Sequence, residues 1–322
     1  MTATVLLSLS PLIILSASVI LVMLTIAFYR SHRLTALLAS GGVLLSGISL
    51  VWARTNAPHQ VTDLILVDGY ALFLIGLILA ASLVVIFFSY FYLQKQPGNP
   101  EEFYLLLLLA LLGSSVLVES THFASFFLGL EILSVSLYGL IAYPRLQAHS
   151  IEAGLKYLIL AAASASFLVF GMGLVYADQG TMVFNQISLV QTGSIPNILT
   201  LAGLGLIIVG LGYKLAVVPF HMWAADVYQG APALVTAFIA TVSKGAVFAL
   251  LLRLFRAVEL DASPALSLVF VIIAILSMLG GNLLALRQDN VKRILAYSSI
   301  AHLGYLLVAF LAGGSRGTAA AI

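Results

Sequence analysis

The chain has 322 residues, of which 62% are hydrophobic and only 8% are charged. Soluble domains carry about 25% charged residues, so this composition excludes an ordinary soluble protein and indicates an integral membrane protein. The net charge of +2 is too small for nucleic-acid binding, and the lack of cysteine excludes disulfides, thiolate metal sites and iron–sulfur ligation within these residues.

Long apolar runs recur along the whole chain. A helix needs about 20 apolar residues to cross about 30 Å of hydrocarbon, and the runs are continuous rather than alternating as in membrane β-strands. We therefore predict an all-α fold, a polytopic transmembrane helical bundle. The ten predicted spans are residues 5–29, 34–53, 70–94, 103–119, 122–143, 154–177, 197–218, 232–256, 264–286 and 291–312.

Lys and Arg residues divide unevenly between the two sides of this bundle. Cytoplasmic segments of membrane proteins are enriched in these residues. We therefore predict that the side with more of them, called the first side, is cytoplasmic and that the N-terminus lies outside. The N-terminus lacks the features of a signal peptide, and the first run is expected to be a retained span. The first side carries seven, Arg30, Arg33, Lys95, Arg145, Arg287, Lys292 and Arg293; the other carries four, Arg54, Arg253, Arg256 and Arg316.

Three charged residues fall deep inside predicted spans. Glu131 lies in the fifth span, and Lys214 lies near the end of the seventh. Lys244 follows Pro232 by about 12 residues, or about 18 Å along a helix, close to the bilayer centre. Each such charge costs about 2.5–3.5 kcal/mol on insertion scales, so their presence requires an explanation.

Two explanations for these charges stay open. Glu131 could form a structural ion pair with one lysine, which would leave the second lysine at depth without a partner. A proton pathway would account for all three, because burial and a neighbouring carboxylate change the proton affinity of a lysine in opposite directions.

Two further titratable residues are weaker candidates. Lys156 follows Glu152 by four residues, so the two share a helix face; a snorkelling helix-end lysine and a pathway role are both open. His302 lies about halfway along the tenth span with hydroxyl residues nearby, where a proton relay and a packing histidine are both open.

A proline interrupts the apolar sequence YKLAVVPFHMWAADVYQGAP at residues 213–232. Pro219 has no N–H, so the carbonyl of Leu215 would lose its helical partner, and a freed carbonyl at membrane depth needs protein or water. An interrupted helix beside Lys214, of the kind that transporters use for ion sites, and a simple helix end at Pro219 both fit. No metal-binding or nucleotide-binding motif occurs in the sequence.

Several segments resemble the antiporter-like membrane subunits of respiratory complex I, the proton-pumping NADH:quinone oxidoreductase. The resemblance covers nearly the whole chain, and among the subunit types of this family the N type fits best. The segments are GLGYKLAVVPFHMWAADVYQGAPALVTAFIATVSKGAVF, LALRQDNVKRILAYSSIAHLGYLLVA, EEFYLLLLLALLG and FLGLEILSVSLYGLIAY.

This resemblance implies an antiporter-like fold of fourteen helices with two inverted five-helix repeats, of which about ten helices would be present here. Residues 1–322 would form one transmembrane domain: 1–96 with the first three helices, 103–256 as the first repeat, and 264–322 as an incomplete start of the second. We therefore expect the sequence to be the front part of a longer protein. The resemblance matches Glu131, Lys214 and Lys244 to the family's charged residues of helices 5, 7 and 8, and Lys156 and His302 to residues of helices 6 and 10.

The function implied by the resemblance is proton translocation without a redox centre in this chain. Lys214 would accept a proton from the cytoplasmic side, Glu131 would modulate it, and Lys244 would pass the proton along the midplane. NADH, FMN, iron–sulfur clusters and quinone would be bound by partner subunits. The direct partners would be neighbouring antiporter-like and small membrane subunits in a bacterial inner membrane, with the peripheral NADH-oxidising arm an indirect one.

Two alternatives remain at this stage. One is a subunit of an Mrp-type cation/proton antiporter or of a membrane-bound hydrogenase, which share the same sequence hallmark. The other is a purely structural membrane subunit whose buried ion pairs only hold helices together.

Overall fold

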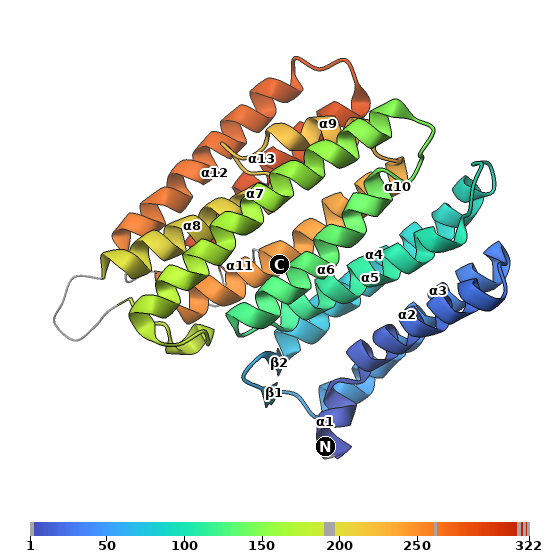
Figure 1. Cartoon of the computed structure of the whole chain (residues 1–322). Helices are drawn as coiled ribbons and strands as arrows, with labels where there is room; N and C mark the ends of the chain where they lie inside the picture. The colour runs from blue at the N-terminus through green and yellow to red at the C-terminus, as the bar shows by residue number, and fades with distance from the viewer. Residues whose placement is uncertain (1–2, 190–196, 261–262, 314–316, 318–319, 321–322) are drawn as a thin grey trace. The chain divides into compact units, whose positions relative to one another are not determined.

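Helices form almost all of the regular structure in this computed structural model, which describes residues 3–189, 197–260, 263–313, 317 and 320 (Figure 1). Within these residues ten helices are long and apolar enough to cross a membrane, which confirms the predicted polytopic helical bundle. The elements are α1 (Ala3–Ser8), α2 (Ser10–Phe28), α3 (His32–Thr55), β1 (His59–Thr62), β2 (Ile65–Val67), α4 (Gly69–Leu93), α5 (Glu101–Glu119), α6 (Phe123–Ile141), α7 (Ala148–Gln179), the 3-10 helix η1 (Phe184–Gln186), α8 (Ile198–Leu215), α9 (Met222–Gly230), α10 (Ala233–Phe238), the π-helix η2 (Ile239–Ser243), α11 (Lys244–Ala257), α12 (Pro264–Ala285) and α13 (Val291–Leu311).

The chain forms two units, each with its own internal packing. The first consists of the chain up to Ile151 together with Ala231–Leu250, and the second consists of Glu152–Gly230 and the chain from Leu251 onward. Glu131 and Lys244 therefore belong to the first unit, whereas Lys214, Lys156 and His302 belong to the second.

In the first unit, helices α5 and α6 pack with their backbones in direct contact. A Cβ atom on Gly113 would lie 2.8 Å from the carbonyl oxygen of Gly129, and a Cβ on Gly129 would lie 3.1 Å from the carbonyl oxygen of Gly113. Small residues allow this close approach between membrane helices. Helix α10 packs against α4 and α6, and η2 packs against α4 and α5, so the segment leading to Lys244 runs among other helices.

A short antiparallel hairpin, β1–β2, connects α3 to α4 outside the predicted spans. Val67 of β2 is fully buried and packs against Ala53 and Leu72. The Asp68 side chain then accepts a hydrogen bond of 2.8 Å from the Ala71 amide and caps the first turn of α4. The hairpin therefore fixes where α4 begins.

In the second unit, α7 crosses α8 and α12 crosses α13 at glycine residues. A Cβ atom on either Gly171 or Gly203 would lie 2.6 Å from the carbonyl oxygen of the other. On α12, a Cβ on Gly281 would lie 2.7 Å from the Ala301 amide nitrogen of α13. The short helix α9 packs against α13. Helix α9, which follows the chain interruption, therefore packs against α13, and α13 is in turn packed closely against α12.

The observed helices differ from the predicted spans mainly at their ends. The span predicted at 154–177 is the longer helix Ala148–Gln179, because a helix can continue through polar turns beyond the hydrocarbon layer. The span predicted at 5–29 is divided at Leu9, with Pro11 in the first turn of α2. Proline has no N–H to donate, so it favours a helix start there. Arg316, counted in the charge bias, lies outside the described residues.

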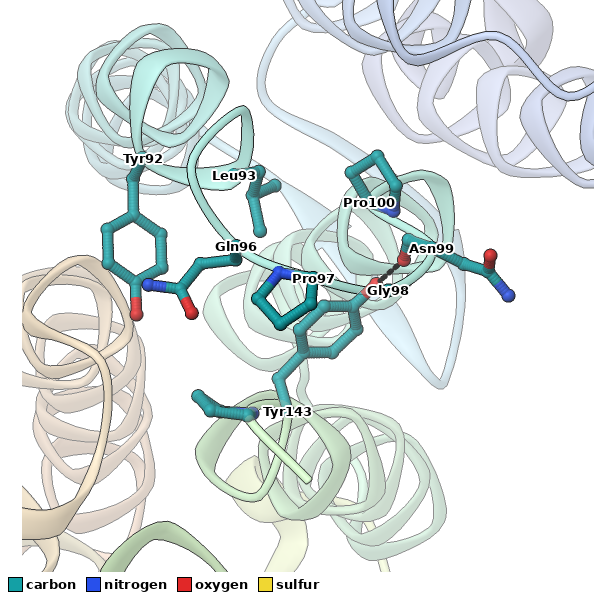
Figure 2. Close-up of a pocket in the computed structure, with 9 residues that line it drawn as sticks. Tyr92, Leu93, Gln96, Pro97, Gly98, Asn99, Pro100 and Tyr143 are labelled. Atoms are coloured by element: carbon teal, nitrogen blue, oxygen red, sulfur yellow. Dashed lines mark hydrogen bonds between the residues drawn. The ribbon is translucent and has the colours of Figure 1, made fainter. Parts of the chain in front are cut away.

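The connection between α4 and α5 is held by Tyr143, which follows α6 (Figure 2). Its hydroxyl donates a hydrogen bond to the Asn99 carbonyl and accepts one of 3.1 Å from the Phe103 amide. Burial, and next the Glu102 carboxylate, raises the pKa of Tyr143 to about 12, so the hydroxyl stays protonated as a donor. The hollow beside it is lined by uncharged residues, which are Tyr92, Leu93, Gln96, Pro97, Gly98, Asn99, Pro100, Tyr143 and Pro144.

Candidate functional site

Lys244 lies where the transmembrane helix Ala233–Ala257 changes its backbone hydrogen bonding. Residues Ile239–Ser243 form the π-helix η2, and Lys244 is the first residue of α11. Single π-turns inside α-helices are rare and occur frequently at functional sites. The Lys244 side chain is only 3% exposed, so a residue that carries a charge in water is held in the interior of the bundle.

Glu131 lies in the middle of α6, in the same unit as Lys244. Its Oε1 atom is buried and has no hydrogen-bond donor among the described residues. The neighbouring Ser134 hydroxyl donates to the Leu130 carbonyl at 2.6 Å instead. A buried carboxylate oxygen without a donor is costly and uncommon in folded proteins. Glu131 therefore resembles a functional group more than a member of a saturated structural network.

Lys214 lies in the last turn of α8, immediately before an interruption of the chain. The helix ends at Leu215, and Ala216 adopts a left-handed backbone conformation with a φ of 59°. Pro219 lies between this end and α9, which resumes helical structure at Met222. Helix α8 therefore ends before Pro219, because the left-handed turn at Ala216 already ends it.

The interruption is tied to another helix by a backbone hydrogen bond. The Val218 amide donates to Ser277 Oγ of α12 at 2.9 Å, and the Ser277 side chain is fully buried. The Lys214 side chain is 5% exposed. The geometry combines a buried lysine with a non-helical segment whose polar groups are served by protein, as interrupted membrane helices require.

Three aromatic residues, none of them predicted as a site residue, surround this helix end. Tyr157, Tyr213 and Trp223 come from α7, α8 and α9. Trp223 Nε1 donates a hydrogen bond of 2.9 Å to the Tyr213 carbonyl oxygen, and the Lys214 Nζ atom lies 5.6 Å from the centre of the Tyr157 ring. In the sequence, Tyr157 directly follows Lys156 and Tyr213 directly precedes Lys214, but periodicity alone does not distinguish such aromatic residues from packing residues.

A network of charges surrounds Asp226 of α9. Lys156 Nζ lies 2.8 Å from a carboxylate oxygen of Glu152 and 3.0 Å from Asp226 Oδ2, while Arg293 Nη1 lies 2.7 Å from Asp226 Oδ1. Arg293 also donates to the side chain of Gln229 at 3.0 Å. The four-residue spacing predicted the Glu152–Lys156 pair but not the contacts of Asp226, because those contacts join α7, α9 and α13.

The charge of Asp226 is fixed by its two cationic neighbours. Burial by itself would raise the pKa of Asp226, but hydrogen bonds from Arg293 and then Lys156 more than offset this and lower the pKa below its usual value. Asp226 is therefore a permanent anion near neutral pH. It is suited to holding helices together and not to carrying a proton.

His302 occupies a different environment from the one expected. It lies on an exposed face of α13 within the described chain, with its ring 6.1 Å from the ring of Tyr305. The Tyr305 hydroxyl accepts a hydrogen bond of 3.3 Å from Asn282 of α12. Sequence position gave the depth of His302 along the helix, but not the direction of its side chain.

Metal-ligating residues do not gather anywhere in the described chain: no group of three His, Cys, Asp or Glu side chains there could hold a metal ion. The chemistry available at the buried positions is that of lysine, glutamate, tyrosine and serine. Of these groups, lysine and glutamate can change their protonation state, whereas buried tyrosine and serine hydroxyls keep their protons and act as hydrogen-bonding groups.

Comparison with known sequences gives a consistent result. Residues 120–322 match the family described as NADH:quinone oxidoreductase/Mrp antiporter, transmembrane. NADH-quinone oxidoreductase subunit N of Nitrosospira multiformis is 55% identical over 305 residues, which cover 94% of this chain and 60% of that protein. The subunit of the same name from Methylococcus capsulatus is 50% identical over 314 residues, covering 98% of this chain and 64% of that protein. The chain thus spans less than two thirds of these relatives.

Solved structures share the same fold. A chain of respiratory complex I from Thermus thermophilus superposes with a TM-score of 0.79 at 34% identity, covering 93% of this chain and 64% of that one. A chain of an archaeal membrane-bound sulfane sulfur reductase superposes with a TM-score of 0.84 at 26% identity, covering 98% and 67%. A chain of the Mrp complex from Dietzia sp. reaches 0.84 at 21% identity, covering 100% and 61%, a likeness in fold alone.

Proposed function

Since the chain belongs to the NADH:quinone oxidoreductase/Mrp antiporter transmembrane family, we propose that it is a proton-translocating membrane subunit of an NADH:quinone oxidoreductase. The observation that carries this proposal is the burial of two lysines in a helical membrane bundle, with Lys214 5% exposed and Lys244 3% exposed. Burying an ammonium is costly, and a purely structural role does not require two of them.

Each buried group has a role that its surroundings support. Lys214, beside the interruption after α8, takes up a proton from the cytoplasmic side. Lys244, on the π-interrupted helix, carries the proton on near the bilayer centre. Glu131, a buried carboxylate whose Oε1 atom has no hydrogen-bond donor in the described residues, modulates Lys214 through its charge. Lys156 and His302 are not buried: Lys156 is 44% exposed and paired with Glu152 and Asp226, and His302 lies on an exposed face of α13. We assign them a secondary role, at the edges of the pathway.

The whole protein, of which this chain is a part, is placed in a complex. It resides in a bacterial inner membrane with the N-terminus on the outer side, among neighbouring antiporter-like and small membrane subunits. Residues 103–256 form a first five-helix repeat, and 264–322 begin a second. In this proposal the redox chemistry belongs to partner subunits, which would bind NADH, FMN, iron–sulfur clusters and quinone.

The relatives favour this proposal over the alternatives. Proteins 50–55% identical over most of this chain are named as subunits of NADH-quinone oxidoreductase, whereas the Mrp chain is similar only in fold. An Mrp-type antiporter would exchange a cation such as Na⁺ for protons without NADH. Proton uptake that requires NADH, and that is unchanged when Na⁺ is removed, therefore discriminates between the two.

The decisive test is Lys244→Ala in the full-length protein within its assembled complex. NADH-driven proton uptake by inside-out membrane vesicles should fall at least about tenfold, because a positioned proton carrier contributes about 10²-fold or more to transfer. The matched control is Lys95→Ala, which removes a lysine from the exposed turn after α4 and should leave uptake unchanged.

Glu131→Gln should also lower NADH-driven uptake, since it removes the charge but keeps the shape of the side chain. The amount of assembled complex, followed on native gels, should stay normal in both variants. Normal proton uptake in Lys244→Ala would refute the relay. Failure of assembly in Glu131→Gln would instead support a structural role for that residue.

A further inference from the structure

The Lys214 ammonium lies over the face of an aromatic ring. Its Nζ atom is 5.6 Å from the centre of the Tyr157 ring, within the range of about 6 Å in which a cation is attracted to a ring face. Lys214 is 5% exposed and Tyr157 is 2% exposed. The attraction is stronger at such a desolvated site than at the protein surface.

The Tyr157 ring is itself held by two other aromatic side chains. Its centre lies 5.0 Å from the Trp223 ring and 6.5 Å from the Tyr213 ring, and the last two are 5.4 Å apart. These separations are those of favourable aromatic pairs. Trp223 follows the interruption and Tyr213 precedes it, so the three rings connect both sides of the interruption to α7.

A second contact joins the same helices a short distance away. Lys156, the residue before Tyr157 on α7, contacts Asp226, which lies three residues after Trp223 on α9. Arg293 holds the other oxygen of Asp226 from α13. The ionic network therefore fixes α9 against α7 and α13 and keeps Trp223 in position against the Tyr157 ring.

We propose that Tyr157 is a positioning residue for Lys214, with its ring face holding the ammonium at the helix interruption and Trp223 holding the ring. A ring face attracts the charged ammonium but accepts no proton from it, unlike a carboxylate. Lys214 is thereby kept in one place and can still release its proton to another acceptor. This inference rests on the proposed function, in which Lys214 carries protons.

The test replaces position 157 by phenylalanine and by phenylalanines with one, two and three ring fluorines, in the full-length protein within its complex. Fluorine withdraws electron density and makes the electrostatic potential at the ring face less negative. It changes the size of the ring little, so packing is preserved. NADH-driven proton uptake should stay within about twofold for Tyr157→Phe, because the ring face remains. It should then fall stepwise with each fluorine, to about three- to tenfold below Tyr157→Phe for the trifluorinated ring.

The matched control places the same fluorinated residues at Phe270, a buried ring of α12 whose aromatic neighbours are Phe255 and Phe310. Uptake, normalised to assembled complex, should not change along that series. An unchanged series at position 157, or an equal decline at Phe270, would overturn the inference. Lys214→Ala separates the two proposals: if it leaves uptake normal, the proposed function itself is wrong, whereas lost uptake with an unchanged series at position 157 refutes the positioning role alone.

Discussion

Replacing Asp226 by asparagine removes a carboxylate that contacts both Lys156 and Arg293, while the shape of the side chain is kept. Two charge contacts are lost, of 3.0 Å and 2.7 Å. The side chains of Lys156, Asp226 and Arg293 are 44%, 38% and 27% exposed, so they are partly screened. Exposed ion pairs contribute about 0.2–1 kcal/mol each.

The substitution should therefore lower the free energy of local unfolding of α9 by about 1–2 kcal/mol. This value is in the upper part of the range for the sum of two exposed ion pairs, because Arg293 is the least exposed of the three residues. A loss of this size raises the population of the locally open state by about 5- to 30-fold. The direct measurement is amide hydrogen exchange of residues 222–230 in the full-length protein within its complex. The control Asp289→Asn removes an exposed carboxylate before α13 and should leave this exchange unchanged.

The pH dependence gives a second measurement of the same contact. The pKa of Asp226 is lowered in the folded protein, with burial opposing the effect and Arg293 and Lys156 outweighing it. The stabilisation is thus fully present above the unfolded-state pKa of about 3.9, and it is lost as the pH falls through the lower folded-state pKa. Exchange of α9, corrected for its intrinsic rate, should be constant from about pH 5 to pH 8 in the unsubstituted protein. Equal exchange in both proteins, or a change near pH 6, would refute this account.

Two further substitutions test the packing around the pathway. Gly203→Ala should destabilise the α7–α8 crossing by about 1–3 kcal/mol, because its Cβ would lie 2.6 Å from a carbonyl oxygen of α7. Gly205→Ala has open space and should be neutral or stabilising; equal thermal stability of the two variants would contradict the crossing. Ser277→Ala removes the acceptor of the half-buried Val218 amide and should speed exchange of that amide about fivefold or more, since a donor left without its partner costs about 1 kcal/mol or more. The control Ser166→Ala loses only an own-helix bond; slow exchange in Ser277→Ala would show that Val218 has another acceptor.

Much of the architecture was determined by local composition. Each transmembrane helix needs a long apolar run, and this requirement is visible in the sequence without knowledge of any neighbour. Deeply placed charges such as Glu131, Lys214 and Lys244 stand out for the same reason, since an ionisable residue within an apolar run is rare. The spacing of Glu152 and Lys156 also predicted their contact, because both lie on one helix face.

Other features arise from contacts between distant segments, which composition and periodicity do not contain. Asp226 meets Lys156 and Arg293 only because α9 packs beside α13. The direction of His302 on α13 depends on which face α12 covers. Helix α8 ends at Leu215, four residues before Pro219, because Ala216 adopts a left-handed backbone conformation.

The sequence by itself determined that the chain crosses the membrane many times and places charged residues within its spans. The free-energy cost of exposing an apolar group to water, or of burying a charged one, depends on the type of residue and can be read from each segment alone. Only the tertiary structure decided what surrounds those charges. Tyr157 lies beneath Lys214 because α7, α8 and α9 converge at the interruption, and the energy of a cation over a ring depends on distance and direction in space. That geometry is a property of the packed helices and not of any one segment.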